Sequence, residues 1–161
     1  MRSVLKNRQI VEDHWQAVGD EEELPSGAVI VSLARWRHER ASLLARGGPL
    51  GVRLPNTVDV VEMVADLPRL ELVALEFPKF SDGRALSQAR LLRERYGYRG
   101  EIRAMGDVLR DQLFFMTRCG FDAFEPRPDR SLEDALAAFD EFSASYQPAA
   151  DQPLPLYRRG R

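Results

Sequence analysis

The sequence has few of the residues that most often carry metal or redox chemistry. Its one cysteine, Cys119, excludes an intramolecular disulfide, and two histidines, His14 and His38, leave no zinc-type Cys and His spacing. It also lacks a basic surplus, because 23 Lys and Arg face 25 Asp and Glu, a net charge of −2. A dedicated nucleic-acid-binding protein would need that surplus to contact phosphates. We therefore expect neither a metal site nor a nucleic-acid partner.

Long apolar runs are missing too. Residues 28–34 form the longest one, which Ser32 interrupts and which is far too short to span a bilayer. The first fifteen residues lack the apolar core of a signal peptide, so no membrane location is expected and the cytoplasm is the default. The motifs GxGxxG, GxxxxGK[ST], CxxC and HExxH are absent, and we expect no cofactor.

Charge is spread unevenly along the 161 residues. Residues 12–23 hold six acids and no Lys or Arg, whereas residues 84–118 hold eight Arg and four acids. Residues 120–151 hold eight acids and two Arg. A near-neutral total thus hides a basic middle between acidic flanks, a distribution that steers charged partners.

Apolar, β-branched runs alternate with helical patterns after residue 27. The expected strands cover residues 28–33, 50–54, 70–77, 101–105 and 121–125. The expected helices cover about 37–46, 57–67, 84–96 and 107–118, and a last one opens at Ser131, whose spacing to Asp134 resembles a capping box. This alternation predicts an α/β protein with a parallel sheet of about five βα units over residues 28–146.

The two ends lie outside this alternation. Residues 1–27 are interpreted as an N-terminal β-ribbon and an acidic linker. Residues 147–161, rich in Pro and Arg, are interpreted as a flexible tail.

The two faces of the expected strands differ. One face is apolar throughout, and the other places charged residues near the strand ends; these are Arg53, Glu76, Arg103 and Glu125. A βα-barrel, with all helices outside, can carry such charges inside, where neighbours of opposite sign neutralise one another. Five units cannot close an eight-stranded barrel. We therefore expect an open, incomplete TIM-barrel-like sheet, covered on its polar face by the N-terminal ribbon, a second subunit or another protein. A flavodoxin-like doubly wound sheet is the alternative.

Candidate functional residues gather where the expected strands end, which is where parallel α/β proteins bind ligands. The candidates for binding an anion or a partner are Arg53, Glu76, Lys79, Asp82, Arg84, Arg103, Asp107, Arg110, Asp111 and Glu125. Two of them, Glu76 and Asp107, are weak candidates for proton transfer.

These candidates also have a structural interpretation. Ser81, Asp82 and Asp107 would only cap helices. Glu76 and Glu125 would be counter-ions of neighbouring arginines, the role that we prefer over an acid/base pair.

Other residues are expected to be structural. Cys119 lies at a helix C-terminus, which does not lower a thiol pKa, and is expected to be inert. The two histidines are expected at the surface. Arg90, Arg93 and Arg95 are expected to form a solvated helix face, and residues 114–116 to belong to the core.

The run FPKFSDGRALSQARLLRERYGYRGEIRAMGDVLRDQLFFMTRCGFDAF, residues 77–124, resembles the bacterial domain-of-unknown-function family nine-three-four. The patterns LARW, GVRL and LVALEF extend the resemblance over about residues 28–125. Members of that family are often labelled oxidoreductases and tend to be encoded beside the sulfite/nitrite reductase haemoprotein and phosphoadenylyl-sulfate reductase. The resemblance thus implies a role in sulfite reduction but identifies no catalytic residue.

Three hypotheses follow. The first is a non-enzymatic accessory protein of assimilatory sulfate reduction, which docks on the sulfite reductase or its electron donor through the basic region 84–118. The second is a small enzyme or sensor that binds a sulfur oxyanion or a phosphorylated metabolite through Lys79, Arg84, Arg103 and Arg110. The third is a homodimerisation module.

Overall fold

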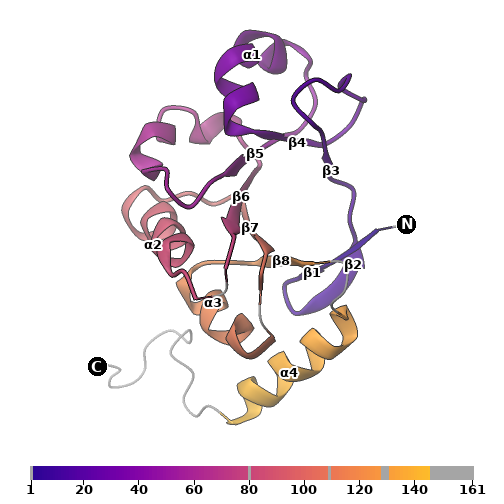
Figure 1. Cartoon of the computed structure of the whole chain (residues 1–161), viewed down its shortest axis with the longest axis vertical. Coiled ribbons are helices and arrows are strands. Elements are labelled where there is room, and N and C mark those ends of the chain that lie inside the picture. The colour runs from indigo at the N-terminus through magenta and orange to yellow at the C-terminus, as the bar shows by residue number, and fades with distance from the viewer. Residues whose placement is uncertain (1, 80, 109, 128–130, 146–161) are drawn as a thin grey trace.

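The computed structural model describes residues 2–79, 81–108, 110–127 and 131–145; the tail expected at 147–161 lies outside this part of the chain. The strands described are β1 Ser3–Lys6, β2 Gln9–Glu12, β3 Gln16–Ala17, β4 Val29–Ser32, β5 Leu50–Leu54, β6 Leu72–Phe77, β7 Glu101–Gly106 and β8 Ala123–Pro126. The α-helices described are α1 Leu33–Ala45, α2 Arg84–Arg90, α3 Leu113–Cys119 and α4 Leu132–Ser145. All the strands join in one sheet (Figure 1).

The sheet is mostly parallel and follows chain order. Its strands are arranged β2-β1-β8-β7-β6-β5-β4-β3. From β3 to β8 every neighbouring pair is parallel, while β1 pairs antiparallel with both β8 and β2. A flavodoxin-like sheet reverses its strand order at a switch point, and β4 to β8 show no reversal. The α/β class and the parallel sheet are therefore confirmed, and the strand order does not fit the flavodoxin-like alternative.

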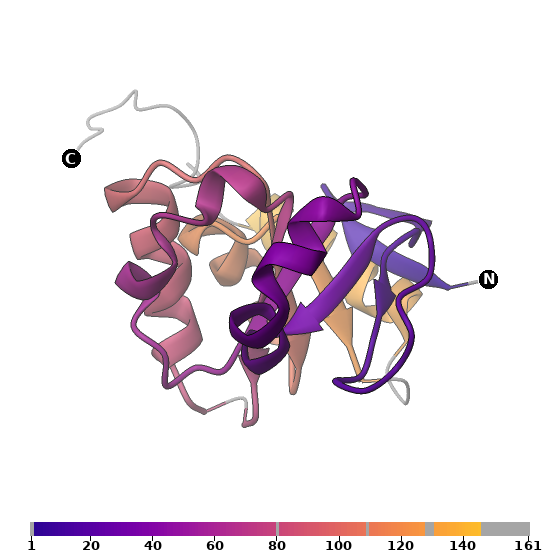
Figure 2. The ribbon, with the colours of Figure 1, turned by 90° about the horizontal axis from the view of Figure 1, so that it is seen from above.

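One face of the sheet carries the main core, as the strand alternation predicts. Val52, Val73 and Leu75, for example, are fully buried in it. Helices α1 and α2 pack against β4 to β6, and α4 packs against β1 and β2. Seen from above, α2 lies on one side of the sheet and the N-terminal segment on the other (Figure 2).

The N-terminal hairpin extends the sheet instead of covering its polar face. Asn7 and Arg8 both have positive φ, 51° and 65°, the conformation that a two-residue hairpin turn between β1 and β2 requires. Strand β1 then pairs with β8. The hairpin of the expected ribbon therefore does not cover the polar face, because its backbone continues the hydrogen-bond ladder, but a later part of the same N-terminal segment does.

A short segment of the chain covers that face instead. Residues 13–15, called the strap below, join β2 to β3, although these strands form opposite edges of the sheet. Four Cα steps of 3.8 Å reach about 15 Å, so the sheet must curl until its edges lie within that distance. Trp15 of the strap packs against Ile30, Leu72 and Ala74 on the polar face. The curl and the strap together give a half-barrel closed by its own chain.

Three expected helices differ from the structure, and the one expected at 107–118 is a 3-10 turn, Arg110–Gln112, followed by α3. The helix expected at 57–67 is replaced by 3-10 turns, Val60–Met63 and Leu67–Arg69, since valines at 58, 60, 61 and 64 and Pro68 disfavour an α-helix. The helix expected at 84–96 is α2 followed by a π-helical turn, Leu91–Arg95. No helix in the described residues is long and apolar enough to cross a membrane.

Candidate functional site

Six charged side chains meet on the polar face where β7, β8 and β1 lie side by side. We call them the inner ion cluster: Arg2, Lys6, Asp13, Glu101, Arg103 and Glu125. Parallel register brings Arg103 beside Ala123, and Ala123 in turn is opposite Lys6, so these positions point the same way. Three cations and three acids balance the charge of the cluster.

Arg103 lies at its centre and has only 1% of its side chain exposed. Its Nη1 and Nη2 donate to the two carboxylate oxygens of Asp13 at 3.0 and 3.1 Å. Nε donates to Glu101 at 2.9 Å, and Nη1 also donates to Glu125 at 3.0 Å. Burial on its own would lower the pKa of Arg103, but the hydrogen bonds and charges of Asp13 and Glu101 raise it above its ordinary value.

Each acid of the inner ion cluster is shared by two cations. Arg2 lies 2.7 Å from Glu125 and 3.4 Å from Asp13, and Lys6 lies 3.0 Å from Glu101. The carboxylates of all three acids are thereby engaged as acceptors in ion pairs. The arrangement is that of a buried ion network which offsets the cost of desolvating Arg103.

A second ion pair lies on the same face and joins the neighbouring strands β5 and β6. Arg53 donates to Glu76 at 2.7 Å, and the two side chains are 32% and 34% exposed. The expected pairing of Arg and Glu across neighbouring strands is thus present twice, here and between Arg103 and Glu125. Both glutamates have the arginine counter-ion that the sequence suggested.

The residues after β6 form a local cap. Asp82 accepts hydrogen bonds from the backbone N–H and the guanidinium of Arg84, the shortest at 2.7 Å, and from Asn56 at 2.9 Å. The hydrogen bonds from Arg84 hold the pKa of Asp82 well below its usual range. The carboxylate therefore fixes the start of α2, as the structural interpretation predicted, although Gly83 takes the N-cap position itself. Lys79 is exposed.

The residues after β7 lead into a 3-10 turn that begins at Arg110. The carboxylate of Asp107 lies 3.7 Å from Arg127. Arg110 donates to Asp134 at 2.9 and 3.1 Å, tying this loop to α4, and Asp111 is exposed.

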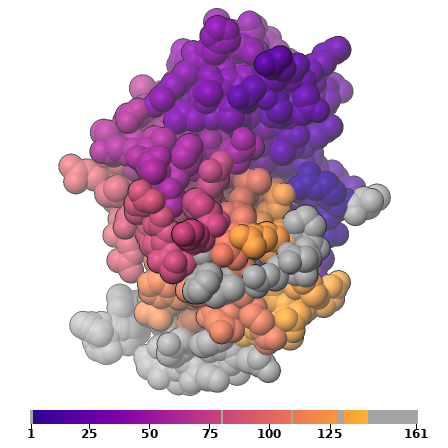
Figure 3. Space-filling view, viewed as in Figure 1, coloured from indigo at the N-terminus to yellow at the C-terminus, as the bar shows by residue number. Residues whose placement is uncertain are grey.

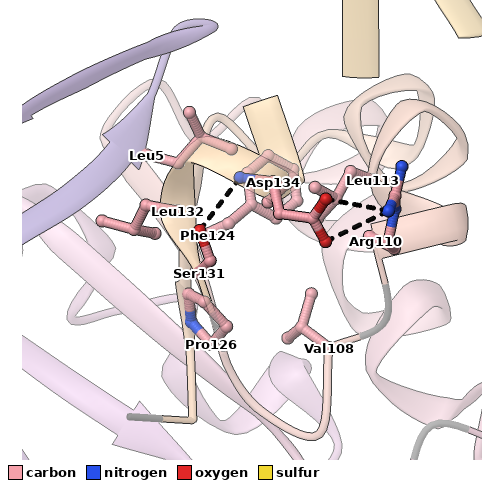
Figure 4. Close-up of a pocket in the computed structure, with 10 residues that line it drawn as sticks. Leu5, Val108, Arg110, Leu113, Phe124, Pro126, Ser131, Leu132 and Asp134 are labelled. Carbon is pink, nitrogen blue, oxygen red and sulfur yellow. Dashed lines mark hydrogen bonds and ion pairs between the residues drawn. The ribbon is translucent and has the colours of Figure 1, made fainter. Parts of the chain in front are cut away.

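Arg110 and Asp134 border a small cavity at the start of α4 (Figure 4). The hydroxyl of Ser131 accepts from the Asp134 backbone N–H at 3.1 Å, which confirms the predicted cap. The cavity, of about 60 Å³, is otherwise lined mainly by apolar side chains such as Leu5, Val108 and Leu113. A space of that size holds a few water molecules, so it offers little room for a metabolite.

Three of the four cations expected to bind one anion have separate partners. Arg103 belongs to the inner ion cluster, Arg84 binds Asp82, and Arg110 binds an acid of α4. The structure therefore does not gather them, with Lys79, into a single pocket.

An exposed basic and apolar surface lies on α2, the π-helical turn and α3, which pack together. We call it the α2–α3 face: Arg90, Leu91, Arg95, Phe115 and Arg118. Leu91 is 37% and Phe115 48% exposed, and these two are among the few large apolar side chains exposed in the described residues. Phe115 was expected in the core with Phe114 and Met116. The structure corrects this, because only the other two face inward from α3.

Arg93 does not belong to that face. Its Nε donates to the carbonyl of Gly120 at 3.0 Å, and Nη1 donates to the carbonyls of Tyr98 and Gly100, each at 2.8 Å. The prediction that it is solvated is wrong, because three backbone acceptors converge on its guanidinium. Cys119 is buried, and His14 and His38 are exposed, as expected.

Sequence reasoning missed four members of the inner ion cluster. Glu101 precedes Arg103 by two residues on one strand, so alternation alone places both on the same face. Arg2 and Lys6 also alternate along β1, but nothing in the sequence said that β1 pairs with β8. Asp13 carried no signal, because its position depends on the path of the strap.

A family model described as a bacterial protein of unknown function (DUF934) matches residues 51–157, more than half of the chain. The protein belongs to this family. The DUF934 match includes the α2–α3 face and Arg103, whereas the strap with Asp13 precedes it. No curated protein matches the chain significantly.

Proposed function

We propose that the protein is a non-catalytic docking component of assimilatory sulfite reduction. It binds the sulfite reductase haemoprotein, or the electron donor of that enzyme, through the α2–α3 face. The observation that carries the proposal is the α2–α3 face itself, where the large apolar side chains of Leu91 and Phe115 are exposed beside exposed arginines.

The inner charges support a structural role. A catalytic acid or base must reach the proton that it transfers. The three acids of the inner ion cluster each contact two cations, and Glu76 contacts Arg53. The alternative function, an anion-binding enzyme or sensor, has less support because three of its four expected cations, Arg84, Arg103 and Arg110, have separate partners.

The α2–α3 face has the composition of a docking surface. Arginine and aromatic residues are enriched in protein interfaces, and exposed Leu91 and Phe115 supply apolar area between the arginines. The pink segment containing α2 forms part of the molecular surface in Figure 3. A π-helical turn, such as the one at residues 91–95, is frequent at functional sites.

Charge indicates the kind of surface that binds. Arg90, Arg95 and Arg118 outnumber the exposed Glu94 beside them, which makes the α2–α3 face basic, so its partner surface is acidic. Exposed acids at residues 20–23 lie in the β3–β4 loop, away from α2 and α3 in Figure 1. This separation of charge orients the encounter and raises the association rate more than the final affinity.

The identity of the partner is taken from the family resemblance, which implies sulfite reduction. The finer architecture that we propose is an incomplete TIM-barrel-like sheet. Its chain-order strands and its helix-covered outer face support this assignment. In such a scaffold the helices lie outside, where α2 and α3 are accessible to another protein.

The test is direct binding of the purified full chain to purified sulfite reductase haemoprotein, and separately to its electron donor. Binding that weakens as NaCl rises from 50 to about 300 mM is expected, since salt screens charge pairs at an interface rim. The double variant Arg95→Glu with Arg118→Glu should reduce the association rate by about tenfold or more.

The matched control changes net charge equally elsewhere. Arg37→Glu with Arg69→Glu alters two exposed arginines on α1 and the Leu67–Arg69 turn, and should bind like the wild type. Equal losses in both double variants would mean that net charge alone, and not the α2–α3 face, governs binding. No binding of either partner at low salt would refute the docking function.

A further inference from the structure

We propose that Arg103 and Arg2 form a binding site for a small oxyanion, and that the carboxylate of Asp13 occupies it in this structure as an internal substitute. The site is independent of the α2–α3 face and of the docking function. Its ligand class is an anion that presents two oxygens with the spacing of a carboxylate, such as a small carboxylate or sulfate.

The geometry at Asp13 is that of anion recognition. Two guanidinium nitrogens of Arg103 meet the two carboxylate oxygens one to one, at 3.0 and 3.1 Å, and Arg2 approaches one of those oxygens at 3.4 Å. Paired N–H donors of this kind bind any ligand with two suitably spaced oxygens. Both Asp13 and Arg103 are 1% exposed, so the pair lies in a water-poor setting where such contacts are strong.

Charge counting shows what the site needs. Without Asp13, the inner ion cluster would hold three cations, Arg2, Lys6 and Arg103, against two acids, Glu101 and Glu125. The remaining charge of +1 next to a buried guanidinium calls for one added negative charge. A singly charged oxyanion such as formate or acetate would restore the neutrality that Asp13 provides, whereas the dianion sulfate would leave an excess of one negative charge and should bind more weakly.

Asp13 differs from the other two acids in its attachment. Glu101 and Glu125 project from β7 and β8, where both strands pair on two sides, so their positions are fixed. Asp13 projects from the strap, outside the strands. Its backbone N–H donates to the Arg2 carbonyl at 2.9 Å, and its side chain accepts from Trp15 N–H at 3.1 Å. Asp13 can therefore leave if the strap lifts and its backbone hydrogen bond to Arg2 breaks, while β7, β8 and both other acids stay in place.

Trp15 reports that movement. It is half-buried against Ile30, Leu72, Ala74 and Met105, a small apolar cluster separate from the main core. Lifting the strap would expose its indole to water. The other tryptophan, Trp36, is buried against the opposite face and bonded to Asp66, so it should not respond.

The experiment titrates the full chain with sodium formate, acetate or sulfate while following tryptophan emission, with NaCl at equal ionic strength as the reference. A saturable red shift with at least one oxyanion, absent with chloride and absent in Trp15→Phe, is expected. In Asp13→Asn the competing carboxylate is gone, so half-saturation should fall by about tenfold. The exposed-acid control Glu23→Gln should titrate like the wild type.

Two results would overturn the site. One is a wild type with no saturable response to any oxyanion, which would make Asp13 a permanent part of the sheet closure. The other is an unchanged half-saturation in Asp13→Asn. If that variant does not fold, hydrogen exchange of the wild type decides: faster exchange at the strap amides of Asp13 and Trp15 with formate supports the site, and equal exchange refutes it.

Discussion

Replacing Asp13 by alanine should destabilise the protein far more than the same replacement at an exposed acid. Removing one partner of a buried ion pair costs about 3–5 kcal/mol when the other charge is left alone. Arg103 would keep Glu101 at 2.9 Å and Glu125 at 3.0 Å, so part of its stabilisation remains. We therefore expect a loss of about 2–3 kcal/mol in the free energy of unfolding, below the full cost of an unpaired buried charge.

Urea unfolding followed by circular dichroism measures this loss. Glu23→Ala, at an exposed acid of the β3–β4 loop, should stay within about 0.5 kcal/mol of the wild type. Combining Asp13→Ala with Arg103→Met should recover part of the loss, because the double variant no longer buries an under-compensated cation. A loss below about 1 kcal/mol in Asp13→Ala would refute the central place of this pair in the network.

Three further variants test other parts of the structure. Glu76→Gln should cost under about 1 kcal/mol in urea unfolding, because its pair with Arg53 is partly solvated; a loss like that of Asp13→Ala would contradict this. Tyr98→Phe should cost about 1–2 kcal/mol, since it leaves the buried Leu70 carbonyl without its 2.9 Å hydrogen bond, and a neutral effect would argue against that bond. Burial raises the pKa of Asp122 above the unfolded value of about 3.9, so its ionisation reduces stability as pH rises from 4 through the folded pKa. Asp122→Asn should therefore gain stability relative to the wild type between pH 4 and 7, and a flat or falling difference would show the sign to be wrong.

Strand alternation predicted much of the architecture because it depends on local sequence alone. The five apolar runs became β4 to β8, and their apolar side became the helix-covered core. The same alternation brought Arg53 to Glu76 and Arg103 to Glu125.

The remaining features depend on contacts between distant segments. A β-ribbon was expected in the N-terminal segment, but not that its strand β1 pairs with β8, nor that the two-residue strand β3 pairs with β4 at the opposite edge. Asp13 meets Arg103 only because the sheet curls and the strap crosses it, which no local pattern encodes. Arg93 was expected in solvent, but backbone carbonyls, including that of the distant Gly120, converge on its guanidinium. Phe115 was expected in the core, but its side of α3 is exposed.

The docking function is tested most directly in a strain whose own copy of this protein has been deleted. The account predicts that wild-type protein restores growth on sulfate and sulfite, that Arg95→Glu with Arg118→Glu does not, and that sulfide supports every strain. It also predicts that Arg37→Glu with Arg69→Glu restores growth like the wild type. Full growth on sulfite with the α2–α3 face reversed, or in the deletion strain itself, would contradict it.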